Sequence, residues 1–195
     1  MPILVLASAS TRRLYLLRQI GIAPDNVEPA DIDERPRRGE LPAHHVVRLA
    51  EEKARTVRPH HPDAFILAAD TVVACGRRIL PKAEDETTAR TCLKLLSGRR
   101  HRVYGGVALL TPTDELAIRR VVTQVAFKRL SDQEIDAYLA TGEWEGKAGG
   151  YAIQGCAAAM IPWVSGSYSN VVGLPLYETA QLLAGRGYRV CRKSC

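Results

Sequence analysis

One carboxylate is conspicuous because of its surroundings. Asp70 interrupts a nearly continuous apolar stretch at residues 64–73, which has the composition of a buried strand. Burying a carboxylate costs several kcal/mol unless a cation or hydrogen-bond donors replace the lost water. A metal and phosphate site would supply such partners. Alternatively, Asp70 ends the strand and caps a turn with Thr71, and position alone leaves both interpretations open.

A second acidic segment could add ligands to such a site. It contains Asp31, Asp33 and Glu34. Carboxylate oxygens of this kind are the ligands that magnesium takes in proteins. Acidic loops are also commonly solvated without binding anything. The segment by itself therefore does not distinguish a metal site from a solvated loop.

Candidate anion-binding groups gather where the first apolar stretch gives way to a helical pattern. The side chains there are Ser8, Ser10, Arg12 and Arg13. Hydroxyls, guanidinium groups and free backbone N–H groups at the positive end of a helix suit a chain of phosphates. The alternative is a capped helix with surface arginines.

Two lysines and a glycine-rich segment are ambiguous in the same way. Lys53 falls within a helical pattern and Lys82 follows Pro81 in a turn, so each is either a solvated lysine or a phosphate ligand. Glycines at 149, 150 and 155 flank Gln154. Such glycine density lets backbone approach a ligand or only bends a strand.

Composition and charge narrow the classes of protein. The 195 residues are 46% hydrophobic and 25% charged, as in a globular protein and unlike a disordered chain. The longest apolar run, residues 156–164, is about half of what a membrane-spanning helix needs, and the N-terminus lacks the basic region of a signal peptide. We therefore expect a cytoplasmic protein without a membrane partner. The net charge is +6, but aromatics are only 6%, so a small phosphorylated ligand explains it at least as well as nucleic acid.

The cysteines do not predict a structural site. There are five, and no pair has the C-x-x-C spacing, which argues against a disulfide framework and a zinc site. Cys191 and Cys195 lie four apart in a basic tail. We expect an unstructured terminus there, not a redox or metal element.

Periodicity and capping residues indicate the elements that must position the polar groups. We expect helices from Ser10 to Gly21, at 42–57, at 85–96, from Ser131 to Gly142 and at 176–183. We expect strands near Val5, at 64–73, at 101–110 and 116–129 as a hairpin, and in the segment that reaches Val164. Helices and strands alternate, but hairpins interrupt the order. This predicts an α/β fold with a single elongated mixed sheet flanked by helices.

From the residues alone we infer only an α/β protein with a candidate site for phosphate and a metal ion. No Walker loop, serine elbow or zinc-protease helix is present. Taken together, however, the sequence resembles the Maf family of nucleoside triphosphate pyrophosphatases from Leu4 to about Leu183. The segments that carry the resemblance are 6–13 (LASASTRR), 31–34 (DIDE), 48–54 (RLAEEKA), 69–73 (ADTVV), 96–104, 142–143, 147–155 (KAGGYAIQG) and 166–176.

The resemblance implies roles for several of these residues. Asp70 is expected to be the proton acceptor that activates water, and with Glu34 it is expected to hold a divalent cation, Mg²⁺ or Mn²⁺. The residues implied to hold the triphosphate and stabilise developing charge are Ser8, Arg13, Lys53 and Lys82. The implied catalytic set is Asp70, Glu34, Lys53 and Lys82.

The resemblance also implies a substrate. Arg12, Thr71 and Gln154 match positions that the family associates with the choice of base, and the sequence is similar to the branch that acts on dTTP and UTP, not 7-methyl-GTP. The expected architecture is one domain over residues 1–195, with two lobes around a central cleft and an inosine triphosphate pyrophosphatase-like fold. The expected assembly is a homodimer. The alternative function is a non-catalytic, nucleotide-binding regulator of septum formation.

Three positions depart from the family pattern. Thr11 stands where proline is usual, the order Pro81-Lys82 differs from the common one, and Gly105 replaces a threonine or a similar residue. The order at Lys82 puts the direction of its side chain in question. None of the departures removes a carboxylate or Ser8.

Overall fold

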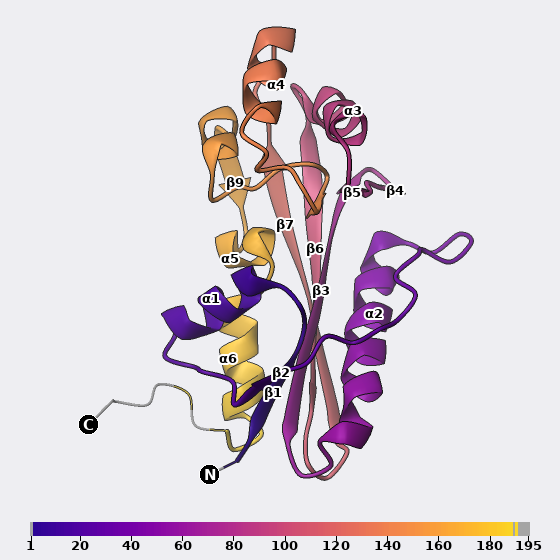
Figure 1. The fold of residues 1–195 in the computed structure, drawn as a ribbon, viewed down its shortest axis with the longest axis vertical. Helices are drawn as coiled ribbons and strands as arrows, with labels where there is room; N and C mark the ends of the chain where they lie inside the picture. Colours follow the sequence, from indigo (N-terminus) through magenta and orange to yellow (C-terminus); the bar gives the residue numbers. More distant parts are fainter. Residues whose placement is uncertain (1, 189, 191–195) are drawn as a thin grey trace.

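One sheet with three long strands forms the axis of the molecule (Figure 1). The computed structural model describes residues 2–188 and residue 190. The strands of the main sheet are β1 (Leu4–Ala7), β2 (Asn26–Val27), β3 (Phe65–Cys75), β4 (Arg78–Ile79), β6 (Arg100–Leu110), β7 (Leu116–Ala126) and β9 (Trp163–Ser165). Their order is β2-β1-β3-β6-β7-β9, with β4 paired to β3. β1 is parallel to β2 and β3, whereas the other pairs are antiparallel. The predicted single elongated mixed sheet is therefore confirmed.

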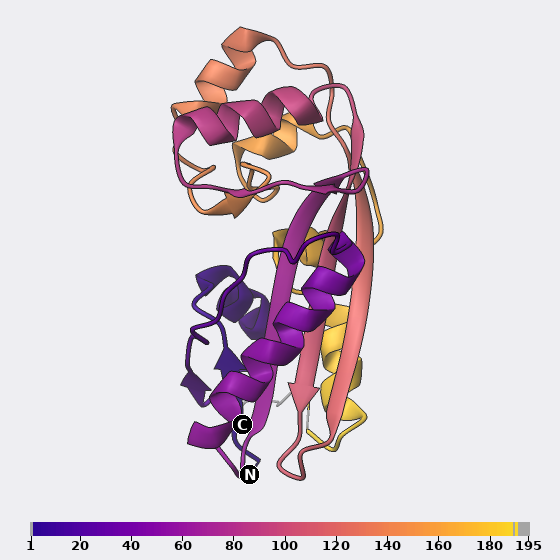
Figure 2. The same ribbon diagram turned by 90° about the vertical axis from the view of Figure 1, so that its right-hand side faces the viewer.

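The helices divide between the two ends of this sheet (Figure 2). They are α1 (Thr11–Gln19), α2 (Pro42–Val57), α3 (Glu86–Leu96), α4 (Asp132–Leu139), α5 (Tyr168–Val172) and α6 (Leu176–Ala184), with 3₁₀ turns η1 (Arg58–His60) and η2 (Cys156–Met160). We call the end with β1, α1, α2 and α6 the basal half. The end with α3, α4, η2 and the small ribbon of β5 (Lys82–Ala83) and β8 (Lys147–Ala148) is the distal half. β3 and β6 continue through both halves.

Helix α2 lies unusually close to the sheet at one position. The core beneath it is rich in small residues, among them Ala50, Ala54 and Ala108. A Cβ added at Gly106 would come within 2.1 Å of the Val46 carbonyl oxygen, so only glycine fits there. Gly106 pairs with Asp70 in the register of β3 and β6. The close approach thus brings α2 to the sheet beside the buried carboxylate.

Most of the predicted elements are present with nearly the predicted bounds. Helix α2 spans the predicted 42–57, the β6–β7 hairpin is formed, and Ser131 closes a complete capping box with Glu134. Asp70 does not end its strand, because β3 continues five residues beyond it. The capping alternative for Asp70 is therefore wrong.

The segment before Val164 was predicted poorly. Residues 156–160 form the turn η2, and only Trp163–Ser165 pair as a strand. The apolar run suggested a strand because composition alone does not separate a buried turn from a strand. The sequence reading also missed the ribbon of β5 and β8 and the short helix α5.

Two further findings concern single segments. Within the described residues, no helix is both long enough and apolar enough to cross a membrane. The described cysteines, Cys75, Cys92 and Cys156, are free thiols. Cys191 and Cys195 lie outside the described residues.

Candidate active site

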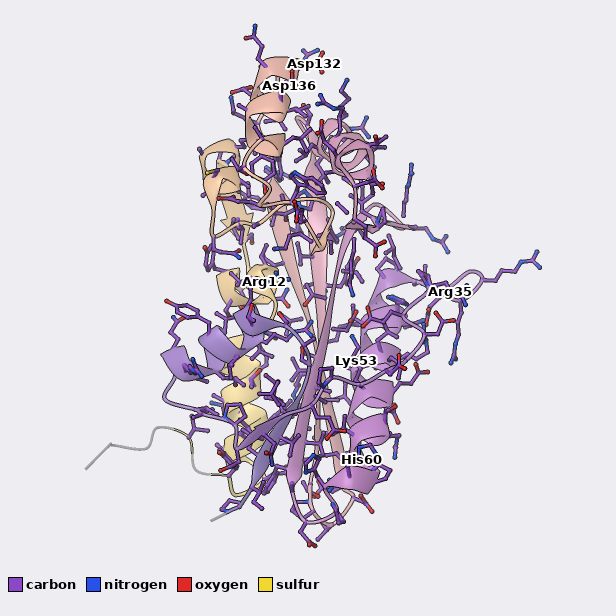
Figure 3. All side chains as sticks on the ribbon, viewed as in Figure 1. Arg12, Arg35, Lys53, His60, Asp132 and Asp136 are labelled. Carbon is purple, nitrogen blue, oxygen red and sulfur yellow. The ribbon has the colours of Figure 1, made fainter. Side chains whose placement is uncertain are left out.

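Most of the side chains proposed from the sequence line one cavity between the basal and distal halves. Asp31 and Asp33 are not among the residues that line it, and Asp33 instead forms an exposed ion pair with Arg35. The cavity has a volume of about 380 Å³. Its walls include Ser8, Arg12, Arg13, Glu34, Lys53, Asp70, Thr71, Lys82 and Gln154. Figure 3 places Lys53 on α2 and Arg12 on α1, on either side of β3. The cavity is therefore assembled from segments that lie far apart in the sequence.

A buried ion pair lies at the centre of the cavity. Lys53 on α2 and Asp70 on β3 are only 6% and 4% exposed, and Lys53 Nζ donates a hydrogen bond of 2.8 Å to Asp70 Oδ1. Lys53 Nζ also lies 2.6 Å from Glu34 Oε1. Two carboxylates thus converge on one ammonium group. The sequence left Lys53 open between a solvated lysine and a ligand, and the structure shows it buried.

Glu34 connects the two halves across the cavity. Its other oxygen, Oε2, accepts a hydrogen bond from Lys82 of the distal ribbon. Burial by itself raises the pKa of Glu34, but the hydrogen bonds from Lys53 and Lys82 outweigh it and lower the pKa to about 2. Glu34 is therefore ionised at neutral pH. The side chain of Lys82 points into the cavity despite the unusual order of Pro81 and Lys82.

The loop that carries Glu34 is held from outside the cavity. Arg48 Nε and Nη2 donate to the two carboxylate oxygens of Glu40 at 2.6 and 2.8 Å, and Nη2 also reaches the Arg35 carbonyl oxygen at 3.3 Å. Arg48 Nη1 donates to Glu52 at 2.9 Å. Residues 28–41 contain no helix or strand. These ion pairs replace regular secondary structure in fixing the loop.

Arg13 forms a second fixed cationic group. It is 8% exposed, and its Nη1 donates to Ser8 Oγ and its Nε to the Gly173 carbonyl, both at 2.9 Å. Its Nη2 lies 3.4 Å from Thr71 Oγ1, which donates in turn to the same carbonyl at 3.2 Å. Burial lowers the pKa of Arg13, partly offset by Asp70, but a guanidinium remains charged in proteins. Ser8 and Arg13 therefore present an orientated anion site.

The opposite end of the cavity is much less constrained. The side chains of Arg12 and Gln154 have no hydrogen-bond partner among the described residues, and Gln154 is exposed. Both also line a second, adjoining cavity of about 520 Å³ with Tyr15 and Tyr168. Burial lowers the pKa of Arg12 without a carboxylate to offset it. These side chains are free to bind a ligand.

Lys147 lines the cavity and was not among the predicted site residues. It lies in β8, and its Nζ donates to the Glu145 carbonyl at 2.8 Å. Burial and the nearby Arg12 both lower its pKa. Its place before the glycine-rich segment was the only sequence signal. That signal did not indicate a role, because the pairing of β8 with β5 is what brings it to the cavity.

The remaining departures from the family pattern have local explanations. A Cβ at residue 105 would lie 1.9 Å from Asn170 Oδ1, so Gly105 makes room for this buried side chain. Asn170 Nδ2 donates to the Val103 carbonyl at 3.2 Å and to Thr123 Oγ1 at 3.1 Å. Thr11 is the first residue of α1, where proline and threonine are both accommodated.

The acidic residues of the cavity suit a divalent cation that is shared with a ligand. Within the described part of the chain, no group of three or more His, Cys, Asp or Glu side chains is gathered to hold a metal alone. Asp70 and Glu34, however, direct oxygens toward one point, now marked by Lys53 Nζ. Mg²⁺ typically uses one or two carboxylates and takes its other ligands from water and phosphates. The donor set fits that pattern.

Comparisons with known proteins agree along nearly the whole chain. The sequence profile of the family described as Maf-like protein matches residues 3–186. A dTTP/UTP pyrophosphatase of Paramagnetospirillum magneticum is 65% identical over 188 residues, which are 96% of this chain and 99% of the relative. The protein of that name from Rhodospirillum rubrum is 64% identical, over 95% of this chain and 89% of the relative. Among solved structures, a HAM1 protein from Coxiella burnetii matches with 17% identity and a TM-score of 0.46, over 67% of this chain and 75% of that chain.

Proposed function

The chain belongs to the Maf-like protein family, and on this premise we propose that it hydrolyses dTTP and UTP to the nucleoside monophosphate and pyrophosphate. The observation that carries the proposal is the division of the cavity. One end holds the buried carboxylate of Asp70 and the half-buried carboxylate of Glu34 among cations, and the other holds free polar groups. A triphosphate fits the first end and a base fits the second.

Fixed positive charge at the first end binds the phosphates in our proposal. Ser8, Arg13, Lys53 and Lys82 surround this part of the cavity. Phosphoryl transfer depends largely on positioning and on stabilisation of charge on the phosphate oxygens. Arg13 needs little reorganisation on binding, because three of its nitrogens are already held.

Asp70 acts as the general base. The Lys53 ammonium stabilises its carboxylate form by binding Oδ1 and leaves the remaining acceptor capacity for a water molecule. That water attacks the α-phosphate as its proton passes to Asp70. The bond from the α-phosphorus to the bridging oxygen breaks, and pyrophosphate leaves. Lys82 and Arg13 stabilise the negative charge of the leaving group.

A divalent cation would be held by Asp70 and Glu34 together with the phosphates. When bound, Mg²⁺ or Mn²⁺ supplies charge neutralisation for the phosphate oxygens. Asp70 and Glu34 would be its carboxylate ligands, and Lys53 would bind the phosphate oxygens. The homodimer expected from the family resemblance stays a prediction.

Base selection is assigned to Arg12 and Gln154. Uracil and thymine present acceptor, donor and acceptor groups along their pairing edge, and the Gln154 amide can both donate and accept there. Thr71 affects base selection through the shape of the cavity wall. Its hydroxyl is already hydrogen-bonded to Arg13 and to the Gly173 carbonyl, so it is not available to bind the base.

A nucleotide panel tests the proposal. Canonical triphosphates and 7-methyl-GTP are assayed for pyrophosphate with Mg²⁺ and with excess chelator. We expect the highest kcat/KM for dTTP and UTP, with activity only when the metal is present. Orthophosphate as the first product, or full activity in chelator, contradicts the mechanism. A purine as the best substrate contradicts the base assignment, and nucleotide binding without turnover would favour the regulator of septum formation.

A further inference from the structure

Gln154 is poorly placed to select a base by its side chain alone. Its amide has no hydrogen-bond partner among the described residues, so nothing holds one orientation of the carboxamide. A freely turning amide matches cytosine as well as uracil, because it presents either a donor or an acceptor. Discrimination therefore requires a donor and an acceptor that cannot exchange places, and the backbone N–H and C=O groups around residue 154 supply them only where this segment is held rigidly.

We propose that Glu143 is the positioning residue that provides this rigidity, an inference that rests on the proposed function. Glu143 Oε2 accepts a hydrogen bond of 2.7 Å from the backbone N–H of Cys156. Charged acceptors of this kind form shorter and stronger hydrogen bonds than neutral ones. The carboxylate thereby holds the backbone two residues after Gln154.

Gly155 shows how closely the carboxylate lies against this backbone. A Cβ added at residue 155 would come within 2.1 Å of Glu143 Oε2 and 2.6 Å of Oε1. The φ angle of Gly155 is −111°, which any residue adopts. Glycine is therefore required here for space, and the space is occupied by Glu143.

The other side of Gln154 is held by the same part of the distal half. The backbone N–H of Ala152 donates to the Tyr138 hydroxyl at 3.0 Å. Thr141 Oγ1 donates to the Tyr138 carbonyl at 2.7 Å and accepts from the Glu143 N–H at 3.2 Å. One connected set of hydrogen bonds, made by the last turn of α4 and the residues that follow it, thus holds the chain on both sides of Gln154. Gln154 projects from the middle of this segment into both cavities.

The environment of the Cys156 side chain is consistent with the contact. The thiol lies beside the same carboxylate, and its hydrogen bond to Glu143 raises the pKa of Cys156. Glu143 therefore binds the backbone of Cys156 and also raises the pKa of its thiol. Its loss would release the segment 154–156 without touching Asp70, Lys53 or the phosphate-binding arginine.

The experiment compares kcat/KM for dTTP and dCTP in variants of the full chain. The ratio of the two values is independent of the fraction of folded enzyme, so partial misfolding does not imitate a change in specificity. We expect Glu143→Ala to lower the ratio about fivefold to tenfold, through a higher KM for dTTP with kcat changed less than about twofold. Glu143→Gln keeps an acceptor oxygen and should retain most of the ratio. Glu145→Ala, an exposed carboxylate two residues away, should leave it unchanged.

A double-mutant cycle sharpens the test. Gly155→Ala should lower the ratio because its methyl group collides with the Glu143 carboxylate. In the Glu143→Ala background the same substitution should have little further effect, since the collision partner is absent. Additive effects in the cycle overturn the inference, as does an unchanged ratio in Glu143→Ala. A wild-type enzyme without preference for dTTP over dCTP overturns the proposed function and this inference with it, whereas a preference that survives in Glu143→Ala overturns the inference alone.

Discussion

The two ends of the cavity are built on different principles. At the phosphate end, Ser8, Arg13, Lys53 and Asp70 are all nearly buried and joined by hydrogen bonds to one another or to the backbone. At the base end, Arg12 and Gln154 have no such partner among the described residues, and the latter is exposed. One end is preorganised and the other is open.

The difference follows from what each end has to do. Stabilising developing charge is most effective when the groups are held before the reaction, since reorganisation then costs little. These groups lie on β3, on α2 and at the junction of β1 and α1, where regular structure limits their movement. Reading a base requires side chains whose hydrogen-bonding capacity is not already used. Rigidity at that end comes from the backbone on both sides of Gln154, which accepting groups of Glu143 and Tyr138 hold.

The largest effect should come from the preorganised end. Asp70→Asn keeps the shape of the side chain but loses the proton acceptor, so we expect kcat to fall about 10²- to 10⁴-fold. Steady-state pyrophosphate release measures the loss, and a thermal melt checks that the fold is intact. Near-normal turnover with unchanged stability would remove Asp70 from the chemistry.

The next largest effect should come from Arg48, which holds the loop that carries Glu34. Arg48→Ala removes the hydrogen bonds to Glu40 and Arg35, so Glu34 should be held less firmly. We expect the Mg²⁺ concentration for half-maximal activity to rise about tenfold or more, as for loss of groups that orient metal ligands. The matched control is Arg55→Ala, which removes an exposed pair with Glu51. Equal metal dependence in the two variants contradicts the role of this loop.

A smaller effect is expected at the open end. Gln154→Ala should lower the dTTP to dCTP ratio of kcat/KM about tenfold, because one hydrogen bond in a partly enclosed site is lost. The kcat for dTTP should change less than about threefold, since Gln154 makes no contact with the ion pair of Asp70 and Lys53. Measurements across the nucleotide panel separate the two quantities. An equal loss of kcat for all nucleotides would contradict the assignment of Gln154 to base selection.

The smallest effect concerns acid stability. The pKa of Glu34 is lowered from 4.5 to about 2, so its ion pairs stabilise the fold fully above about pH 4.5 and lose this contribution as the pH falls through about 2. Glu34 is 34% exposed, which reduces the contribution to about 1 kcal/mol or less. Urea unfolding at pH 7 and pH 3 should show a smaller decrease in Glu34→Gln than in wild type. Glu86→Gln, on the exposed surface of α3, serves as the control, and an identical pH dependence in all three proteins refutes the expectation.

Local patterns were sufficient where a few neighbouring residues determine the outcome. Helix α2 follows from its apolar spacing and Pro42, and α4 begins at the capping box of Ser131 and Glu134. The wrong prediction of a strand at residues 156–160 arose because a contact with a distant residue, and not a local pattern, determines the structure there. An apolar run was read as a strand, but a turn braced by Glu143 buries part of it instead.

The sequence predicted most of the residues of the candidate site, but not their burial or their contacts with one another. The family resemblance named nine side chains that line the cavity, yet the residues alone could not show that Lys53 is buried. Lys147 and Glu143 were missed as functional residues. Each reaches its place through pairing or bracing in the distal half, which no local spacing encodes.

The sequence by itself determined most of the helices and long strands and which chemical groups are available, because propensity, periodicity and capping act over a few residues. Only the tertiary structure decided which of those groups meet. Lys53 and Asp70 are 17 residues apart and meet because Gly106 admits α2 to the sheet, and Arg13 finds the Gly173 carbonyl 160 residues away. Contacts between distant segments depend on strand register and helix packing, which are properties of the whole fold and not of any one stretch of chain.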